Sequence, residues 1–479
     1  MKTTVPPACS STWGKLLTSL QFVSCDQHNV QLEHSRKPYK WQEPWNRIPP
    51  TITKNTQVKH TESRFKQLSL RVLQQLQGGA QFTASNVTIT KTALVGVEVR
   101  DQGSAATLSD CTLKEFPPLY NETFAVRAVH AHAGSKVTLT STTVSGGVFG
   151  VDARVAAEAT LTDCNIRNPV QACVVIRNGA CGWLEGCLLG RTLQCDLPMS
   201  YGLYVDGPGS ETHANKTRFV GHAQSGAFVH ETAKLTAHAC ISSGNHVSGF
   251  VVHSKGRMEL KDCRSERDGK GCLVEEGGSL AAVNVTVARS EGEAFAIGEE
   301  GQAQLVGCSG TNCGEEGVQV AHEGTVVLLE MCTFSQNEFD NVVVRQGATA
   351  ILNECTLSQS ATKSGVAAEG ELTNVSMRGC TLSRNAQCGV LADQGAKVTA
   401  HVCMSKKNKR EGYTVTGGAR MDVRDSTSED DAVGCRVGGG RKMLLQAVVV
   451  DGVPTTGTLL AGEPCAQNEL YLPGSSIEL

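Results

Sequence analysis

Residues 225–247 read SGAFVHETAKLTAHACISSGNHV, and residues 248–265 start the same pattern again as SGFVVHSKGRMELKDCRS. Apolar residues alternate over short stretches of both segments, which is the period of a β-strand. Glycine and asparagine separate these stretches, as tight turns require. The pattern therefore predicts that each unit forms short strands joined by turns and contains no helix.

A step of the form Cys-x-apolar marks the same place in most units and shows how far the repeat extends. The step or its equivalent recurs from Cys111 to Ser426, and eleven of its thirteen intervals are 22 to 25 residues long. Units of this kind stack so that each position forms a column with one residue per coil. Sixteen coils at the inter-strand spacing of roughly 4.8 Å make a rod of roughly 75 Å.

We therefore predict an all-β fold, a right-handed parallel β-helix (a solenoid) of about 15–16 coils over residues 80–452. Two other repeat folds do not match. A leucine-rich repeat needs the spacing Leu-x-x-Leu-x-Leu, which the units lack. A left-handed hexapeptide solenoid needs a six-residue period, which is also absent.

The Gly-apolar-x-Val opening of the units and steps such as Asp110-Cys-Thr-Leu113 resemble those of the pectin-lyase-like superfamily. Within it, the units are similar to the non-secreted β-helix repeats of F-box-only and SHC-SH2-domain-binding proteins. The resemblance covers about 370 residues and implies the parallel β-helix fold. It also raises the question of polysaccharide lyase or hydrolase activity. However, the Asn-Thr-Asp, Gly-His-Gly and Asp-Pro-His signatures of such enzymes are absent, and residues 1–80 show no F-box-like segment.

The two ends of the chain depart from the repeat. Residues 1–60 are rich in proline and hold three of the four tryptophans, which predicts an irregular N-terminal arm. Residues 61–79 place Phe65, Leu68 and Val72 on one helical face, which predicts an amphipathic helix that caps the solenoid. Residues 453–479 are predicted to form a C-terminal tail or a second cap.

Composition narrows the classes of function. The chain has 479 residues, a net charge of −3 and 20 cysteines. Near-balanced charge argues against binding along a nucleic-acid backbone, and no apolar run is long enough to predict a membrane span. The N-terminus lacks the pattern of a signal peptide. We therefore expect an intracellular, cytoplasmic protein with reduced thiols.

Ten of the cysteines stand at one position of the unit, in a column that starts at Cys111 and ends at Cys403. Thr142, Thr217 and Val285 take the same position in other coils. No Cys-x-x-Cys pair is present, so zinc-site spacing is missing. The column therefore predicts a buried structural ladder, and we expect no cofactor.

One column predicted to face outward is apolar over five successive coils. A contiguous exposed apolar stripe usually marks an interface or is covered by another segment of the chain. We therefore take these residues as candidates for binding a partner. The stripe consists of Val174, Tyr204, Phe228, Val251 and Leu273.

Two further features are candidate sites. Insertions at residues 116–124 and 191–198 leave the same corner of the solenoid, and could wall a shallow cleft. The candidates on these loops are Phe116, Tyr120, Leu193 and Asp196. His230, His253 and Glu275 follow one another in a polar column and form a weak metal-site candidate, although a solvated polar row explains them equally simply.

These patterns favour a non-catalytic protein-interaction scaffold, or a structural subunit of a larger assembly, that presents a lateral face of a rigid β-helix to a protein partner. The alternative is a carbohydrate-binding protein or a pectin-lyase-like lyase or hydrolase. That alternative requires acids clustered with an arginine or histidine on three adjacent coils, and the sequence does not reveal such a cluster.

Overall fold

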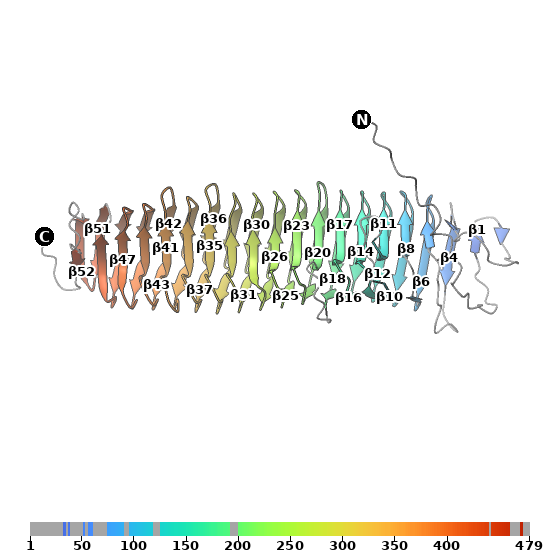
Figure 1. Ribbon diagram of the computed structural model, residues 1–479, viewed down its shortest axis with the longest axis horizontal. Helices are drawn as coiled ribbons and strands as arrows, with labels where there is room; N and C mark the ends of the chain where they lie inside the picture. The colour runs from blue at the N-terminus through green and yellow to red at the C-terminus, as the bar shows by residue number, and fades with distance from the viewer. Residues whose placement is uncertain are drawn as a thin grey trace, which may run out of the picture.

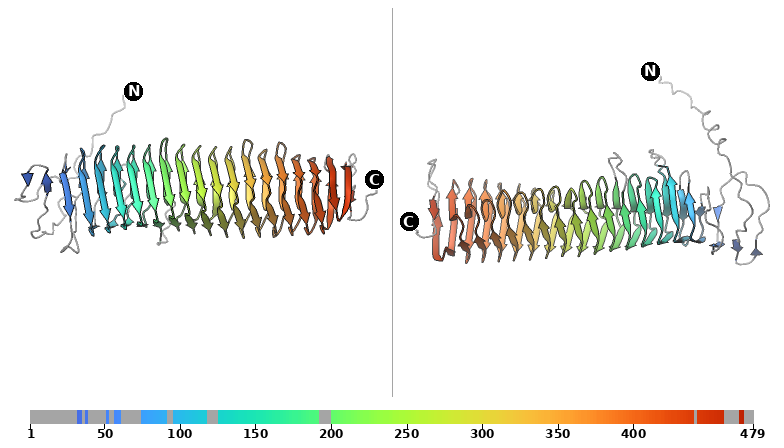
Figure 2. Two further views of the ribbon diagram at one scale, coloured as in Figure 1. Left: turned by 180° about the vertical axis from the view of Figure 1, so that it is seen from behind. Right: turned by 90° about the horizontal axis from the view of Figure 1, so that it is seen from below.

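The fold is described from a computed structural model (Figure 1). It describes residues 32–34, 37–38, 51–52, 56–60, 74–90, 95–117, 125–191, 200–439, 442–459 and 470–472. Strands of successive coils lie side by side, and the colour changes steadily along the rod in Figures 1 and 2. Each coil therefore packs on the coils that precede and follow it in the chain.

Each coil contains three strands. In one coil these are β23 (Ser225–His230), β24 (Lys234–His238) and β25 (Ile241–Ser243). Strands β5 to β49 repeat this order and form 15 coils, which confirms the predicted parallel β-solenoid. The first strand of each coil joins a sheet that we call sheet B. The second and third strands, a long and a short one, join sheet A.

The strands of sheet B pair in parallel with those of neighbouring coils. Ala227 on β23, for example, pairs with Phe250 on the next coil. The members of sheet B in the solenoid are β5 (Gln74–Leu76), β8 (Val95–Arg100), β11 (Arg127–His132), β14 (Phe149–Arg154), β17 (Ala172–Arg177), β20 (Tyr201–Asp206), β23, β26 (Ser248–Val252), β29 (Lys270–Val274), β32 (Phe295–Ile297), β35 (Val318–Ala321), β38 (Val342–Arg345), β41 (Val366–Glu369), β44 (Val390–Asp393), β47 (Glu411–Thr416) and β50 (Val433–Gly438).

The core consists of inward columns, because side chains alternate between the two faces of a strand. On β23 the side chains of Ala227 and Val229 are fully buried, and Phe250 and Val252 repeat them on β26. One coil departs from the expected register. On β17, Val174 and not Cys173 pairs with Leu203 of the next coil.

Glycine precedes the inward residue because the backbone there approaches the short-strand layer closely. A Cβ atom on Gly226 would lie 2.7 Å from the Oγ of Ser242, and one on Gly249 would lie 2.6 Å from the Oγ of Ser265. Real Cβ atoms do not approach other atoms so closely. These contacts explain the Gly-apolar-x-Val opening of the unit.

The cysteine column is buried at the bend between the long and short strands. The thiol of Cys240 lies 3.4 Å from the carbonyl oxygen of His238 and 3.5 Å from that of Ala214 in the preceding coil. Thr142 points its hydroxyl at the two equivalent oxygens, 2.9 Å from Thr140 and 3.3 Å from Leu108. All sixteen described cysteines are free. Cysteine and threonine at this position donate to these carbonyl oxygens, whereas Val285 fills the same buried position without donating.

The ends of the solenoid differ in part from expectation. Strands β3 (Thr51–Ile52) and β4 (Thr56–His60) already pair in parallel with β5 and β6 (Gln81–Ser85), so the stack extends into the predicted arm. The predicted capping helix is not shown, because Leu76 is fully buried on a strand and pairs with Val99. Residues 61–73 of that helix lie outside the described residues.

At the C-terminal end, β52 (Val453–Leu459) pairs antiparallel with β51 (Lys442–Val450), and β53 (Leu470–Leu472) pairs antiparallel with β50. These strands occupy hydrogen-bonding edges that the last coil would otherwise leave open. The described part of the chain contains strands but no helix, and therefore no helix that could span a membrane. An intracellular location remains a prediction.

Candidate functional site on the outer face of sheet B

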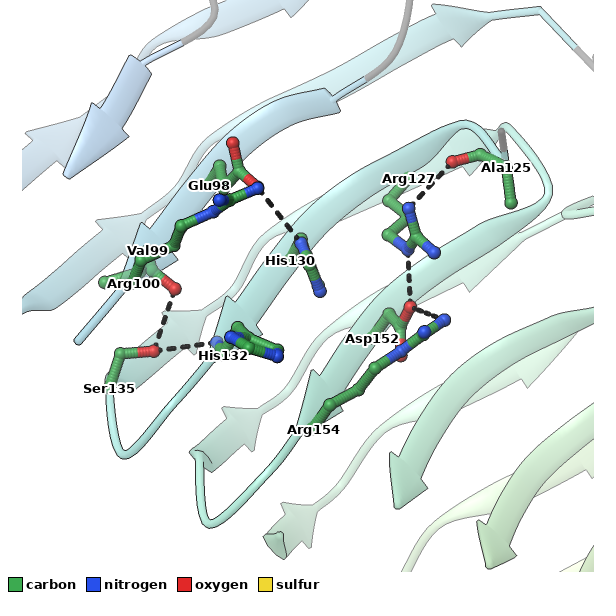
Figure 3. Close-up of polar contacts among 10 residues, drawn as sticks. All are labelled: Glu98, Val99, Arg100, Ala125, Arg127, His130, His132, Ser135, Asp152 and Arg154. Atoms are coloured by element: carbon green, nitrogen blue, oxygen red, sulfur yellow. Dashed lines mark hydrogen bonds and ion pairs between the residues drawn. The ribbon is translucent and has the colours of Figure 1, made fainter. Parts of the chain in front are cut away.

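The outer face of sheet B carries a cluster of buried charged residues in its early coils. Backbone pairing places Glu98, His130 and Asp152 in one column on the adjacent strands β8, β11 and β14. The same column continues through Val175, Tyr204, Phe228, Val251 and Leu273. Figure 3 shows the three polar residues and their partners on one side of the sheet.

Asp152 is the centre of the cluster and is fully buried. Its carboxylate accepts hydrogen bonds from Nε of Arg127 at 2.5 Å and from Nε of Arg154 at 2.8 Å. A third guanidinium, that of Arg177, lies 3.7 Å away. A buried carboxylate is stable only when such partners compensate for its lost hydration. Both oxygens of Asp152 are engaged, so this group is poorly placed to take a proton from a ligand.

Arg177 is the most loosely paired arginine of the charged cluster, because its Nε lies 3.7 Å from Oδ1 of Asp152. Its Nε atom is buried and has no hydrogen-bond partner among the described residues. The guanidinium lies 5.6 Å from the centre of the Phe149 ring, and Arg127 lies 5.8 Å from the same ring. Cation–π contact holds a guanidinium in place without using its N–H groups. Arg177 is therefore positioned to donate to a ligand.

Glu98 and His130 form a hydrogen-bonded pair on the two strands before that of Asp152. Oε1 of Glu98 lies 2.8 Å from Nε of Arg100 and 3.3 Å from Nδ1 of His130. Burial raises the pKa of Glu98, but hydrogen bonds from His130 and Arg100 outweigh it and hold the pKa below its usual value. Nε2 of His130 is buried and has no partner among the described residues.

The cluster has an excess of positive charge. Four arginines, at positions 100, 127, 154 and 177, face two carboxylates. His132 lies in the column of Arg100, and burial together with the charges of His130 and Arg100 lowers its pKa. A partly exposed group of arginines with surplus charge favours an anionic ligand, above all a carboxylate bound by two parallel N–H groups.

Aromatic side chains continue the face on the next two coils. The ring centres of Tyr201, Tyr204 and Phe228 lie 5.2 to 5.4 Å apart, and Tyr204 is nearly parallel to Phe228. These three residues form the aromatic ladder. Tyr204 and Phe228 stack face to face, Tyr201 packs against both at a tilt, and each ring is only partly exposed. Burial raises the pKa of Tyr204 to about 12, so its hydroxyl remains a hydrogen-bond donor at neutral pH.

The predicted apolar stripe is thus corrected in one residue and partly covered. Val174 is fully buried in the core, and the outward residue of its coil is Val175. Residues 172–176 are all apolar, so alternation could not set their register. Val175 and Val251 are buried although they face outward. Val175 belongs to a small apolar cluster with Phe149, against which Tyr201 and Tyr204 pack.

The three residues of the predicted metal candidate belong to two separate pairs. Nδ1 of His230 lies 3.0 Å from Asp206, whereas Nε2 of His253 lies 2.8 Å from Glu275. Within the described ranges, the groups whose ligand atoms converge are Asp206 with His230 and Glu231, and Glu293 with Glu315 and Glu316. Acidic groups of this kind are common without an ion, and we assign no metal to either.

Of the loop candidates, Phe116 is buried against the interior and does not face a cleft. Tyr120, Leu193 and Asp196 lie outside the described residues. The two insertions rejoin the solenoid just before β11 and β20, at the edge of sheet B that bears Arg127 and Tyr201.

Sequence reasoning missed the charged cluster, which is the arrangement that the carbohydrate alternative requires. The 31-residue interval after Cys111 interrupts the repeat and hides the register of the earlier coils in the sequence. A signal was present: Glu98, His130 and Asp152 each follow an inward valine and precede an inward valine or alanine. Aligning those valines across the insertion would have found the column.

Comparison with known proteins identifies the protein family. The family model described as the right-handed beta helix region matches residues 73–287, 201–341 and 325–462. The chain therefore belongs to the right-handed β-helix family, which supports the predicted superfamily and leaves the finer similarity to F-box-only proteins a prediction. No curated protein matches the sequence.

Solved structures show similarity in fold alone. The periplasmic alginate epimerase AlgG is 10% identical with a TM-score of 0.33, and 76% of each chain is covered. The A-module of the mannuronan C-5 epimerase AlgE4 from Azotobacter vinelandii is 13% identical with a TM-score of 0.30, covering 72% of this chain and 86% of the module. Tailspike protein 3 of bacteriophage CBA120 is 10% identical with a TM-score of 0.27. The match covers 82% of this chain and 55% of the tailspike chain.

Proposed function

We propose that the protein binds an acidic carbohydrate along the outer face of sheet B, with the charged cluster as the site for a carboxylate. The observation that carries this proposal is Arg177. Its guanidinium is fixed above Phe149, is only loosely paired with Asp152 and belongs to a side chain that is 24% exposed. A ligand carboxylate would complete its hydrogen bonds.

The neighbouring groups suit a sugar. Tyr201 and Tyr204 place partly exposed phenols on the same face, next to the coil of Arg177. Protonated phenols donate to sugar hydroxyls, and the ring edges offer apolar contact. Because Arg177, Tyr204 and Phe228 lie on three successive coils, the face suits an extended chain of several sugars.

The experiment is titration calorimetry with oligogalacturonate, and with neutral maltooligosaccharides for comparison. Arg177→Gln is expected to weaken binding of the acidic oligosaccharide about tenfold, because it removes one charge-assisted pair. Arg345→Gln is the matched control, since Arg345 occupies the same column of sheet B far along the rod. Equal weakening by both variants, or no binding at all, would disprove the proposal.

The second candidate function, a non-catalytic protein-interaction scaffold, is favoured by a different surface. Val283, Val326 and Ile351 are exposed on the long strands of sheet A at 38%, 43% and 38%. Val326 and Ile351 lie on the adjacent strands β36 (Val326–Glu330) and β39 (Thr349–Asn353), whereas Val283 ends β30 (Ser279–Val283), two coils earlier. Exposed apolar side chains along one sheet suit a protein contact. Native affinity purification tests this candidate: a variant with glutamate at these three positions should lose a protein that a Tyr204→Glu, Phe228→Glu variant retains.

A further inference from the structure

A groove lined by cations runs along sheet A near the C-terminal end, away from the face described above. It crosses the long strands β42 (Asn374–Arg378), β45 (Lys397–His401), β48 (Arg420–Arg424) and β51. The hollow over these strands measures about 780 Å³. Its floor is the middle outward column, which is made of the shorter side chains Ser376, Thr399, Asp422 and Leu444.

One wall of the groove is a column of like charges. Lys397, Arg420 and Lys442 pair in register on three successive strands, and all three are exposed. None of the three has an ion pair with another described residue. The opposite wall contains Arg378 and Arg424. Like charges opposite one another on adjacent strands are destabilising unless a counter-charge is supplied.

For two lysines elsewhere in the same column, acids of the protein supply that counter-charge. Lys136 faces Glu158 on the next strand, with 2.7 Å between Nζ and Oε2. Lys234 lies 3.8 Å from Glu211 and 3.2 Å from Glu259. The three cations of the groove wall lack such neighbours, because the two acids nearby are already bound. Asp422 accepts from Arg424, and Asp425 pairs with His401.

We propose that this groove binds a linear carboxylated or sulfated polysaccharide that lies parallel to the rod axis. A straight column of cations, repeated at the coil spacing of roughly 4.8 Å, suits a polymer with a negative group on successive units. The hydroxyls of Ser376 and Thr399 on the floor suit sugar hydroxyls. The lining residues contain no Phe, Tyr or Trp ring on which nucleic-acid bases could stack. The groove is separate from the sheet B site and does not depend on it.

The test uses the full chain and three variants. The groove variant is Lys397→Gln, Arg420→Gln, Lys442→Gln, and its matched control is Lys136→Gln, Lys234→Gln, Arg257→Gln, which changes the same column in earlier coils. The third variant is Arg177→Gln. The probes are polygalacturonate, heparin, inorganic polyphosphate and single-stranded DNA, and thermal unfolding checks the fold of each variant.

Because the wild type would offer polygalacturonate two sites, the groove and control variants are also made in the Arg177→Gln background. There the groove variant is expected to bind polygalacturonate or heparin about tenfold more weakly than Arg177→Gln alone, with the control near Arg177→Gln and with binding weakened further by added salt. Equal loss in the control, an unchanged groove variant, or binding of polyphosphate or DNA alone would overturn the proposal. Failure of Arg177→Gln to weaken binding, with a clear loss in the groove variant, would refute the sheet B site and leave the groove intact.

Discussion

Two stretches of the outer face of sheet B share one backbone and differ in chemistry. On β8, β11 and β14 the middle outward column holds Glu98, His130 and Asp152. On β32 to β44 the same column holds Ala296, Gln319, Val343, Ala367 and Leu391. The inward columns of both stretches are small apolar residues with nearly no exposure.

This difference separates what the solenoid requires from what it tolerates. The C-terminal stretch shows that alanine and valine are sufficient outward residues for the coil. Buried ion pairs are seldom more stabilising than apolar residues of similar size, because both charges lose their hydration. The charged cluster is therefore not needed for folding, which supports a role in binding.

Asp152→Ala should give the largest difference in stability between the two stretches. Removing this fully buried carboxylate leaves three arginines close together without their counter-charge. We expect the free energy of unfolding of the N-terminal coils to fall by about 2–3 kcal/mol. Gln319→Ala, in the same column of the C-terminal stretch, should change it by less than about 0.5 kcal/mol. Urea unfolding of both variants makes the comparison, and similar values for the two would contradict it.

Removing a ring of the aromatic ladder should give a smaller difference in stability between the two stretches. Phe228→Ala removes a ring that contacts Tyr201, Tyr204 and His253. Because the ring is partly exposed, we expect a loss of about 2 kcal/mol, against about 1 kcal/mol for Leu391→Ala in the C-terminal stretch. Thermal unfolding measures both. A loss for Phe228→Ala no larger than that for Leu391→Ala would show that the stacked rings contribute no more than ordinary apolar contact.

The smallest effect is one of pH. The hydrogen bond to Glu275 raises the pKa of His253 despite its burial, and the same bond lowers the pKa of Glu275. A raised histidine pKa gives stability that is present at low pH and is lost as pH rises through the folded pKa. A lowered carboxylate pKa gives stability that is lost as pH falls through its folded pKa. The pair therefore stabilises the fold in weakly acidic solution.

His253→Gln should lower the free energy of unfolding by about 0.5–1 kcal/mol near pH 6 and by almost nothing near pH 9. Urea unfolding at the two pH values measures the difference. Ala321, Arg345 and Glu369 occupy this column in later coils. Arg345→Gln, at the same position of sheet B, serves as the control. A loss at pH 9 as large as at pH 6 would assign His253 a role in packing.

Much of the fold was predictable because it depends on local repetition. Residues such as Ala227 and Val229 must face inward in every coil, so their period is visible without knowledge of any contact. The site was less predictable. The stripe was assigned to Val174 because five adjacent apolar residues carry no alternation, and the cluster around Asp152 was missed because an insertion interrupts the count.

The sequence by itself determined the parallel solenoid, its approximate number of coils and its cysteine column, since each follows from spacing along the chain. Only the tertiary structure decided that Glu98, His130 and Asp152 meet, that Val175 replaces Val174 on the surface, and that the cations of the groove wall stand in one line. The physical reason is register. Stacking brings together residues 22 to 32 positions apart, and a shift of one residue moves a side chain from the outer face to the core.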